Sequence, residues 1–194
     1  MNDAPLLRFD AVTCLRGGRL LFRDLDLTLQ TGEALVVGGA NGVGKSSLIR
    51  IAAGLLRPFA GTVARGAALG LADEANALDE RLTLGRALAF WARLDGRNSD
   101  AAMAAMGLTH LGEVPVRMLS TGQRKRATIA RVIASEAPLW LLDEPANGLD
   151  SDGAALLAQA IDAHRRGGGA VLAASHLPLG IEGGASLRLE EIQP

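Results

Sequence analysis

The clearest candidates for chemistry are eight consecutive residues that include three glycines, a lysine and a serine. They have the pattern G-x-x-x-x-G-K-S, in which backbone N–H groups surround nucleotide phosphates, the lysine reaches the terminal phosphates and the hydroxyl binds Mg²⁺. Lysine occurs only twice in the 194 residues, against eighteen arginines. A compact ammonium on a flexible stem suits this position better than a planar guanidinium. This phosphate loop and the serine after it comprise Gly39, Ala40, Asn41, Gly42, Val43, Gly44, Lys45, Ser46 and Ser47.

Two adjacent carboxylates form a second candidate group. Asp143 and Glu144 directly follow the apolar run 139–142. A carboxylate at the end of a buried strand can help hold the Mg²⁺ that Ser46 also binds. Glu144 points differently from Asp143, so it could orient or deprotonate the water that attacks the γ-phosphate. The pair therefore predicts a hydrolase, and the alternative is a simple turn from strand to loop.

A histidine follows the next apolar run. His176 comes shortly after 170–174, at a strand end, where ligands bind in open α/β sheets. It could hydrogen-bond the γ-phosphate or the attacking water, although a lone histidine is often structural. His164 is instead expected to offset the dipole at a helix C-terminus.

A further candidate anion site lies at residues 119–123, just before a strongly helical stretch. Ser120, Gly122 and Gln123 would lie at the N-terminus of that helix, where free N–H groups favour an anion. The capping preference alone favours a second interpretation, in which Ser120 caps the helix and no ligand binds.

The elements needed to position these residues alternate between strands and helices. Apolar runs at 34–37, 139–142 and 170–174 read as buried strands of a parallel sheet. The carboxyl ends of parallel strands lie at one edge, so the phosphate loop, the carboxylates and His176 should meet there. The predicted fold is α/β, a P-loop NTPase core with a parallel sheet flanked by helices.

Two regions depart from this alternation. Residues 6–30 have strand patterns and a glycine turn, which predicts an N-terminal antiparallel β subdomain. Residues 79–118 have helical patterns and form the expected helical insertion. We therefore expect a single domain over 1–194, with a core at 1–78 and 119–194 and a helical subdomain at 79–118. A helix capped by Ser151 should follow the carboxylates.

Composition excludes several classes of function. The net charge of −1 and the absence of a long basic tract argue against nucleic-acid binding. A single cysteine, Cys14, permits no internal disulfide and indicates a reducing setting. No apolar stretch is long enough to span a bilayer, and the first residues lack a secretory signal. Any membrane role should therefore depend on a separate partner.

Taken in order, the motifs resemble those of the ATP-binding cassette (ABC) ATPases. The segments that carry the resemblance are 39–46, 119–123, 139–144, 147–150 and His176. The resemblance implies two copies of the chain closed head to tail on ATP and Mg²⁺, with residues 119–123 of one copy facing the phosphate loop of the other. It implies that Ser120, Gly122 and Gln123 contact the γ-phosphate in trans. Glu144 would be the catalytic carboxylate, His176 the switch histidine, and Asp150 part of a loop that couples the two sites.

The amino-acid sequences of 119–126 and 141–150 are also similar to those of the haem-exporter ATPases of bacterial cytochrome c maturation. That resemblance implies an ATPase subunit that consists of the cassette alone, lies on the cytoplasmic face of the inner membrane and pairs with a separate integral membrane permease. Three departures are visible: Thr121 replaces a usual glycine, 73–76 lacks a usual glutamine, and Leu15 with Arg16 stand near the usual adenine-stacking aromatic.

Other functions remain open at this stage. The missing glutamine leaves room for a nucleotide-gated scaffold that closes on a partner with little turnover. The chain could also be the ATPase of another small ABC exporter. A small-molecule kinase would use the same phosphate loop, but residues 119–123 would then have no purpose.

Overall fold

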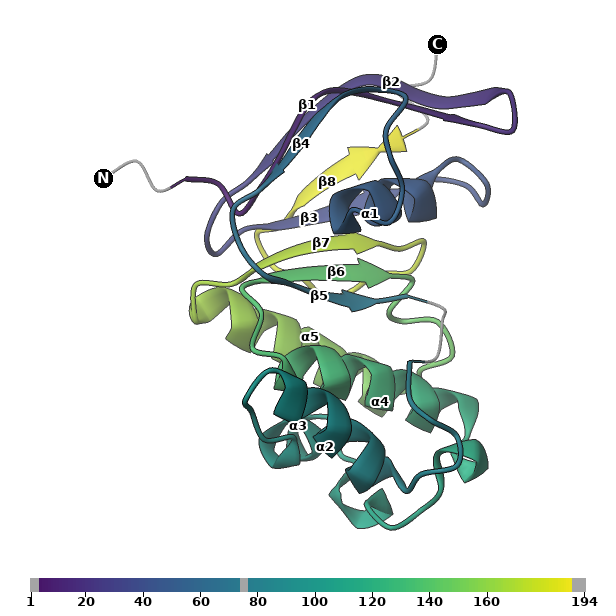
Figure 1. Cartoon of the computed structure of the whole chain (residues 1–194), viewed down its shortest axis with the longest axis vertical. Coiled ribbons are helices and arrows are strands. Elements are labelled where there is room, and N and C mark those ends of the chain that lie inside the picture. Colours follow the sequence, from purple (N-terminus) through teal and green to yellow (C-terminus); the bar gives the residue numbers. More distant parts are fainter. Residues whose placement is uncertain (1–3, 74–76, 190–194) are drawn as a thin grey trace.

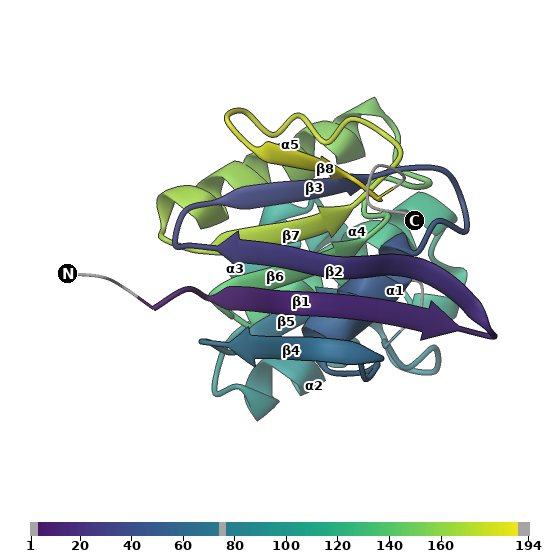
Figure 2. The same ribbon diagram turned by 90° about the horizontal axis from the view of Figure 1, so that it is seen from above.

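The protein consists of two stacked sheets and their helices, as seen in a computed structural model that describes residues 4–73 and 77–189 (Figure 1). The smaller sheet is antiparallel and covers the larger, parallel sheet from above, with one helix between them (Figure 2). Its strands, in the order β2-β1-β4, are β1 (Leu7–Arg16), β2 (Arg19–Leu29) and β4 (Ala60–Arg65). The antiparallel pairing expected within residues 6–30 is confirmed.

The larger sheet contains the apolar runs expected to form parallel strands. Its order is β5-β6-β7-β3-β8, and every described pair in it is parallel. The strands are β3 (Ala34–Gly38), β5 (Leu69–Ala72), β6 (Leu139–Asp143), β7 (Ala170–Ala174) and β8 (Ala185–Arg188). All residues of β6 and β7 are buried, as expected for a parallel sheet covered on both faces.

Helices cover both faces of this sheet. α1 lies between the two sheets, whereas α4 and α5 lie on the other face, with α2 and α3 beyond them (Figure 1). Their bounds are α1 (Lys45–Ala53), α2 (Leu84–Leu94), α3 (Asp100–Ala105), α4 (Thr121–Ala134) and α5 (Ser151–Arg166). Two short 3₁₀ helices, Thr109–Leu111 and Val116–Met118, precede α4. The helices expected within 79–118 are therefore present, and their independence as a subdomain stays a prediction.

Alternate residues of β6 belong to two separate cores. Leu139 and Leu141 pack with α1 and the antiparallel sheet, whereas Trp140 and Leu142 pack with the helices on the other face. Successive side chains of a strand point to opposite faces, so one apolar strand joins both cores. The residue that follows, Asp143, is thereby held at the edge of a doubly covered sheet.

Asp150, rather than Ser151, caps α5. The Asp150 side chain accepts a hydrogen bond of 2.8 Å from the Gly153 backbone N–H, and its own backbone is extended. The expectation that Ser151 is the cap was wrong by one residue, because either residue type can cap a helix. None of the helices in the described residues has the length and apolar character needed to cross a bilayer.

Candidate functional site

The phosphate loop connects the end of β3 to the start of α1. Gly42 and Gly44 have φ values of 81° and 120°, conformations that favour glycine. Gly44 is the residue before the first turn of α1, so the unpaired N–H groups of that turn open towards the loop. A helix N-terminus reached through such a glycine turn is a binding site for phosphate.

Lys45 lies inside this loop rather than in solvent. Its Nζ donates hydrogen bonds of 2.8 Å to the Gly39 carbonyl and 3.3 Å to the Ala40 carbonyl. It is also 3.5 Å from Glu144 Oε1, and its side chain is only 6% exposed. Lys45 also lines a cavity beside the loop, which places its ammonium within reach of the terminal phosphates of a nucleotide bound there.

Glu144 and His176 face each other across two strand ends. His176 Nδ1 lies 2.8 Å from Glu144 Oε2, and the His176 backbone N–H donates to the same oxygen at 3.3 Å. Glu144 has a φ of 47°, unusual for a residue with a side chain. Its backbone N–H donates to the Ala174 carbonyl at 2.8 Å, which helps to hold this conformation.

These groups share one cavity of about 360 Å³. It is lined by Leu21, Asn41, Gly42, Gly44, Lys45, Ser46, Ser47, Glu144, Asn147 and His176. Lys45, Glu144 and His176 come from α1 and from the ends of β6 and β7, so the meeting of strand ends at one edge is confirmed. Leu21 is an additional lining residue that the motifs did not single out, whereas Asn147 belongs to the 147–150 motif but had no role assigned to it.

The oxygen ligands near the loop are suited to Mg²⁺. Asp143 is 2% exposed at the end of β6, and Ser46 lies in the first turn of α1. The described residues contain no cluster of three or more His, Cys, Asp or Glu side chains for a metal. A carboxylate and a hydroxyl instead match a Mg²⁺ that takes its other ligands from phosphate and water.

The 119–123 segment lies at the N-terminus of α4, outside the cavity. Ser120 Oγ accepts from the Gln123 backbone N–H at 3.2 Å, and Gln123 Oε1 accepts from the Ser120 N–H at 2.9 Å. The expected helix cap is therefore present as a reciprocal capping box. A Cβ on Gly122 would come within 2.9 Å of the Gly148 carbonyl oxygen. The start of α4 thus touches the loop that leads from Glu144 to Asp150.

Comparison with known proteins identifies the family of this site. Residues 22–147 match the family described as ABC transporter, which is more than half of the chain. The chain belongs to the ABC transporter family. It is therefore an ABC ATPase, and the resemblance inferred from the motifs is confirmed.

Two relatives agree on the type of ABC ATPase. A protein of Sphingopyxis alaskensis named cytochrome c biogenesis ATP-binding export protein CcmA is 60% identical, over 91% of this chain and 92% of its own length. A protein of the same name from Novosphingobium aromaticivorans is 54% identical over the full length of both. A solved ABC transporter ATP-binding protein from Pyrococcus furiosus has a TM-score of 0.84 at 17% identity, covering 97% of this chain and 99% of that one. It supports the fold.

An exposed aromatic side chain, Phe59, does lie near Leu15: the two residues line one cavity, and Phe59 is 69% exposed. Phe9 and Phe22 are 1% and 0% exposed, so neither can stack on a base, whereas Leu15 is 41% exposed. The segment 73–76, where the glutamine is missing, lies largely outside the described residues, of which only Asp73 is part.

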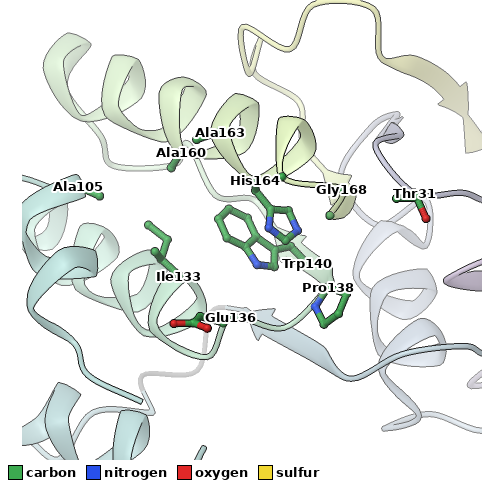
Figure 3. Close-up of a pocket in the computed structure, with 12 residues that line it drawn as sticks. Thr31, Ala105, Ile133, Glu136, Pro138, Trp140, Ala160, Ala163, His164 and Gly168 are labelled. Carbon is green, nitrogen blue, oxygen red and sulfur yellow. The ribbon is translucent and has the colours of Figure 1, made fainter. Parts of the chain in front are cut away.

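A larger cavity, of about 600 Å³, lies at the opposite edge of the sheet and contains none of the predicted site residues (Figure 3). Trp140 and His164 stack there with ring centroids 3.8 Å apart. Burial lowers the pKa of His164, and hydrogen bonding with the backbone of Ala170 and Pro138 offsets this in part. His164 does lie in the last turn of α5, but packing rather than charge defines its surroundings. Sequence reasoning missed this pair because the two residues are distant in the chain.

Proposed function

We propose that this ABC ATPase binds ATP with Mg²⁺, works as a head-to-tail homodimer and powers a separate integral membrane permease. The observation that carries this proposal is the meeting of Lys45, Glu144 and His176 in one cavity behind a phosphate loop. A cation, a carboxylate and an imidazole at one strand edge are the parts needed to bind a triphosphate and position water.

In the proposed reaction, Lys45 neutralises charge on the terminal phosphates and Glu144 acts on the attacking water. Glu144 accepts a hydrogen bond from that water, or its proton, as the bond from the water oxygen to the γ-phosphorus forms and the bond from that phosphorus to the β–γ bridging oxygen breaks, so that ADP leaves. His176, 2.8 Å from Glu144, holds the carboxylate in place and can contact the γ-phosphate. Asp143 and Ser46 would hold Mg²⁺, which supplies charge neutralisation at the β- and γ-phosphates.

The position of the α4 N-terminus supports the proposed dimer. Ser120, Gly122 and Gln123 line none of the phosphate-loop cavity of their own chain. They nevertheless present a hydroxyl and N–H groups at the end of a 14-residue helix, where an anion is favoured. We infer that this site completes the nucleotide site of a second copy, while Asp150, at the end of the loop that touches Gly122, links the two sites.

The proposed transport process comes from the relatives. Both are named as ATP-binding export proteins of cytochrome c biogenesis. We propose the same process here, in which the chain supports haem export or handling from the cytoplasmic face of the bacterial inner membrane. A permease subunit would then be its integral membrane partner.

Replacing Glu144 by Gln tests the enzymatic role. With the permease present, Glu144→Gln should lower phosphate release by about 100-fold or more, because an amide cannot take the proton. The same variant should retain ATP and remain dimeric in size-exclusion chromatography with light scattering. The matched control is Glu113→Gln, an exposed glutamate away from the cavity, which should leave turnover unchanged.

If the wild type with its permease releases phosphate no faster than Glu144→Gln, the hydrolytic role is wrong. Retention of ATP with a closed dimer would then support the nucleotide-gated scaffold. Co-purification from the native membrane identifies the permease, and a permease unrelated to cytochrome c biogenesis would support another small exporter.

A further inference from the structure

Arg131 is a half-buried arginine in the last turn of α4 that the proposed chemistry does not use. It lies on the side of the helix that faces β5 and α2. One guanidinium nitrogen, Nη2, donates a short hydrogen bond to the Leu71 carbonyl of β5. β5 pairs with β6, with Leu71 opposite Leu141. Arg131 therefore joins α4 to the strand beside the one that ends in Asp143.

The same guanidinium also contacts α2. Its central carbon lies 5.2 Å from the centre of the Trp91 ring, a cation–π arrangement. The Trp91 indole Nε1 donates in turn to the Ala77 carbonyl at 2.9 Å. Leu71 lies in β5, and Ala77 lies within residues 73–83, which connect β5 to α2. The Arg131–Trp91 pair thus holds β5 and the connection that follows it against α4 and α2.

The surroundings of Arg131 explain why an arginine is needed there. Burial lowers its pKa, and the charges of Asp73 and Asp95 oppose this effect. Asp73 follows β5, and Asp95 follows α2. A planar guanidinium can stack on a ring while its edge donates to a carbonyl, which an ammonium cannot do. The site therefore holds a cation between three elements rather than exposing it to solvent.

We propose that Arg131 is a positioning residue that fixes where α4 places Ser120 and Gly122 relative to the sheet. This inference rests on the proposed function, because it assumes that these two residues complete a nucleotide site in a second copy. α4 rises about 1.5 Å per residue, so its N-terminus lies roughly 15 Å from Arg131. A small tilt at Arg131 is enough to displace Ser120 from a phosphate, and phosphate contacts tolerate little displacement.

Kinetics on Arg131 variants test the proposal. Arg131→Met keeps an apolar stem but removes both contacts, and it should lower kcat about 10-fold or more. The affinity for ATP of the isolated chain should stay within about twofold, because the Lys45 loop is untouched. Arg131→Lys keeps the charge and one donor, and it should recover part of kcat. The control, Arg93→Met, changes an exposed arginine of α2 and should behave as wild type.

Coupling between the two side chains is the second test. Trp91→Leu should also lower kcat, and the double variant with Arg131→Met should be little worse than either single variant, because the pair acts as one unit. Thermal unfolding of each variant identifies the folded fraction, to which kcat is normalised. A purely structural role would lower the unfolding temperature and leave the normalised kcat unchanged.

A third readout does not depend on turnover. The chain has two tryptophans, so Trp140→Phe leaves Trp91 as the only emitter. In the Glu144→Gln background, adding ATP with Mg²⁺ should shift Trp91 emission, and Arg131→Met should abolish the shift. If Arg131→Met changes neither the normalised kcat nor the ATP-induced shift in Trp91 emission, the proposal fails. If Glu144→Gln leaves phosphate release unchanged, the proposed hydrolytic role itself is wrong.

Discussion

At the scale of single residues, Glu144 combines unfavourable backbone geometry with a central place in the site. A φ of 47° is costly for a residue with a side chain, and such conformations persist only where the surroundings impose them. Here the Ala174 carbonyl, Lys45 and His176 provide that environment. The strain directs the carboxylate towards the phosphate loop, whereas Asp143, one residue earlier, stays within the buried strand end.

Sequence alone predicted the residues whose chemistry has a local pattern. Lys45 was found from the phosphate-loop motif, and Glu144 and His176 were found because each comes soon after an apolar run; the sheet brings such strand ends together. Arg131 and Trp91 could not be found in this way. An arginine on a helix with apolar neighbours looks like a surface residue, and only the packing of α2 against α4 shows otherwise.

The stacking of His164 on Trp140 predicts a pH-dependent stability. Burial lowers the pKa of His164 below its usual 6.5, so the unfolded chain binds a proton first as the pH falls. The free energy of unfolding should therefore decrease as the pH drops through 6.5 and level off below the native pKa. Urea unfolding at several pH values measures this, and His164→Phe, which keeps a ring, should remove this contribution.

The matched control is an exposed histidine. His110→Ala should retain the wild-type pH dependence, because His110 is exposed on a short 3₁₀ helix. If His164→Phe and wild type lose stability equally between pH 8 and pH 5.5, burial of His164 is not the cause of the acid sensitivity.

At the scale of elements, sequence patterns identified helices and buried strands better than exposed edge strands. β6 and β7 are fully buried apolar runs, and both were predicted. β4 and β8 were not predicted, and all of their residues are exposed or half-buried. Their strand conformation comes from pairing with β1 and β3, which depends on residues far away in sequence.

Gly61 in β4 shows how closely the antiparallel strands approach each other. Its φ is 82°, and a Cβ there would lie 2.2 Å from the Ala11 carbonyl oxygen of β1. Gly61→Ala should therefore destabilise the protein by about 2–4 kcal/mol, through backbone strain and displacement of β1. Denaturant unfolding followed by circular dichroism measures the change.

Gly18, in the turn between β1 and β2, provides the comparison. It has a similar φ of 77°, but nothing lies within 4 Å of an added Cβ. Gly18→Ala should cost only the left-handed strain of about 1–2 kcal/mol. If Gly61→Ala and Gly18→Ala lower the free energy of unfolding equally, the close approach to Ala11 adds no destabilisation.

At the scale of the whole molecule, a head-to-tail dimer requires each nucleotide site to draw on two chains. Lys45 and Glu144 belong to one cavity, whereas Ser120 and Gly122 lie outside it at the start of α4. The sequence indicated this division only through the family resemblance, because the capping box by itself accounts for Ser120 and Gln123. A test must therefore separate the cap from the contact made in trans.

Mixing two inactive variants makes that separation. Lys45→Ala removes the phosphate contact but keeps the α4 N-terminus. Gly122→Asp places a negative charge at that N-terminus and, in its own chain, brings a Cβ against the Gly148 carbonyl, but it removes neither partner of the cap between Ser120 and Gln123. In a mixed dimer, one site unites the intact Lys45 with the intact Gly122, and the other site is doubly defective. Mixed protein should therefore recover up to about a quarter of wild-type phosphate release, because half of the dimers are mixed and each has one working site. Mixtures as inactive as the separate variants, with light scattering that shows dimers, would mean that Ser120 and Gly122 act only within their own chain.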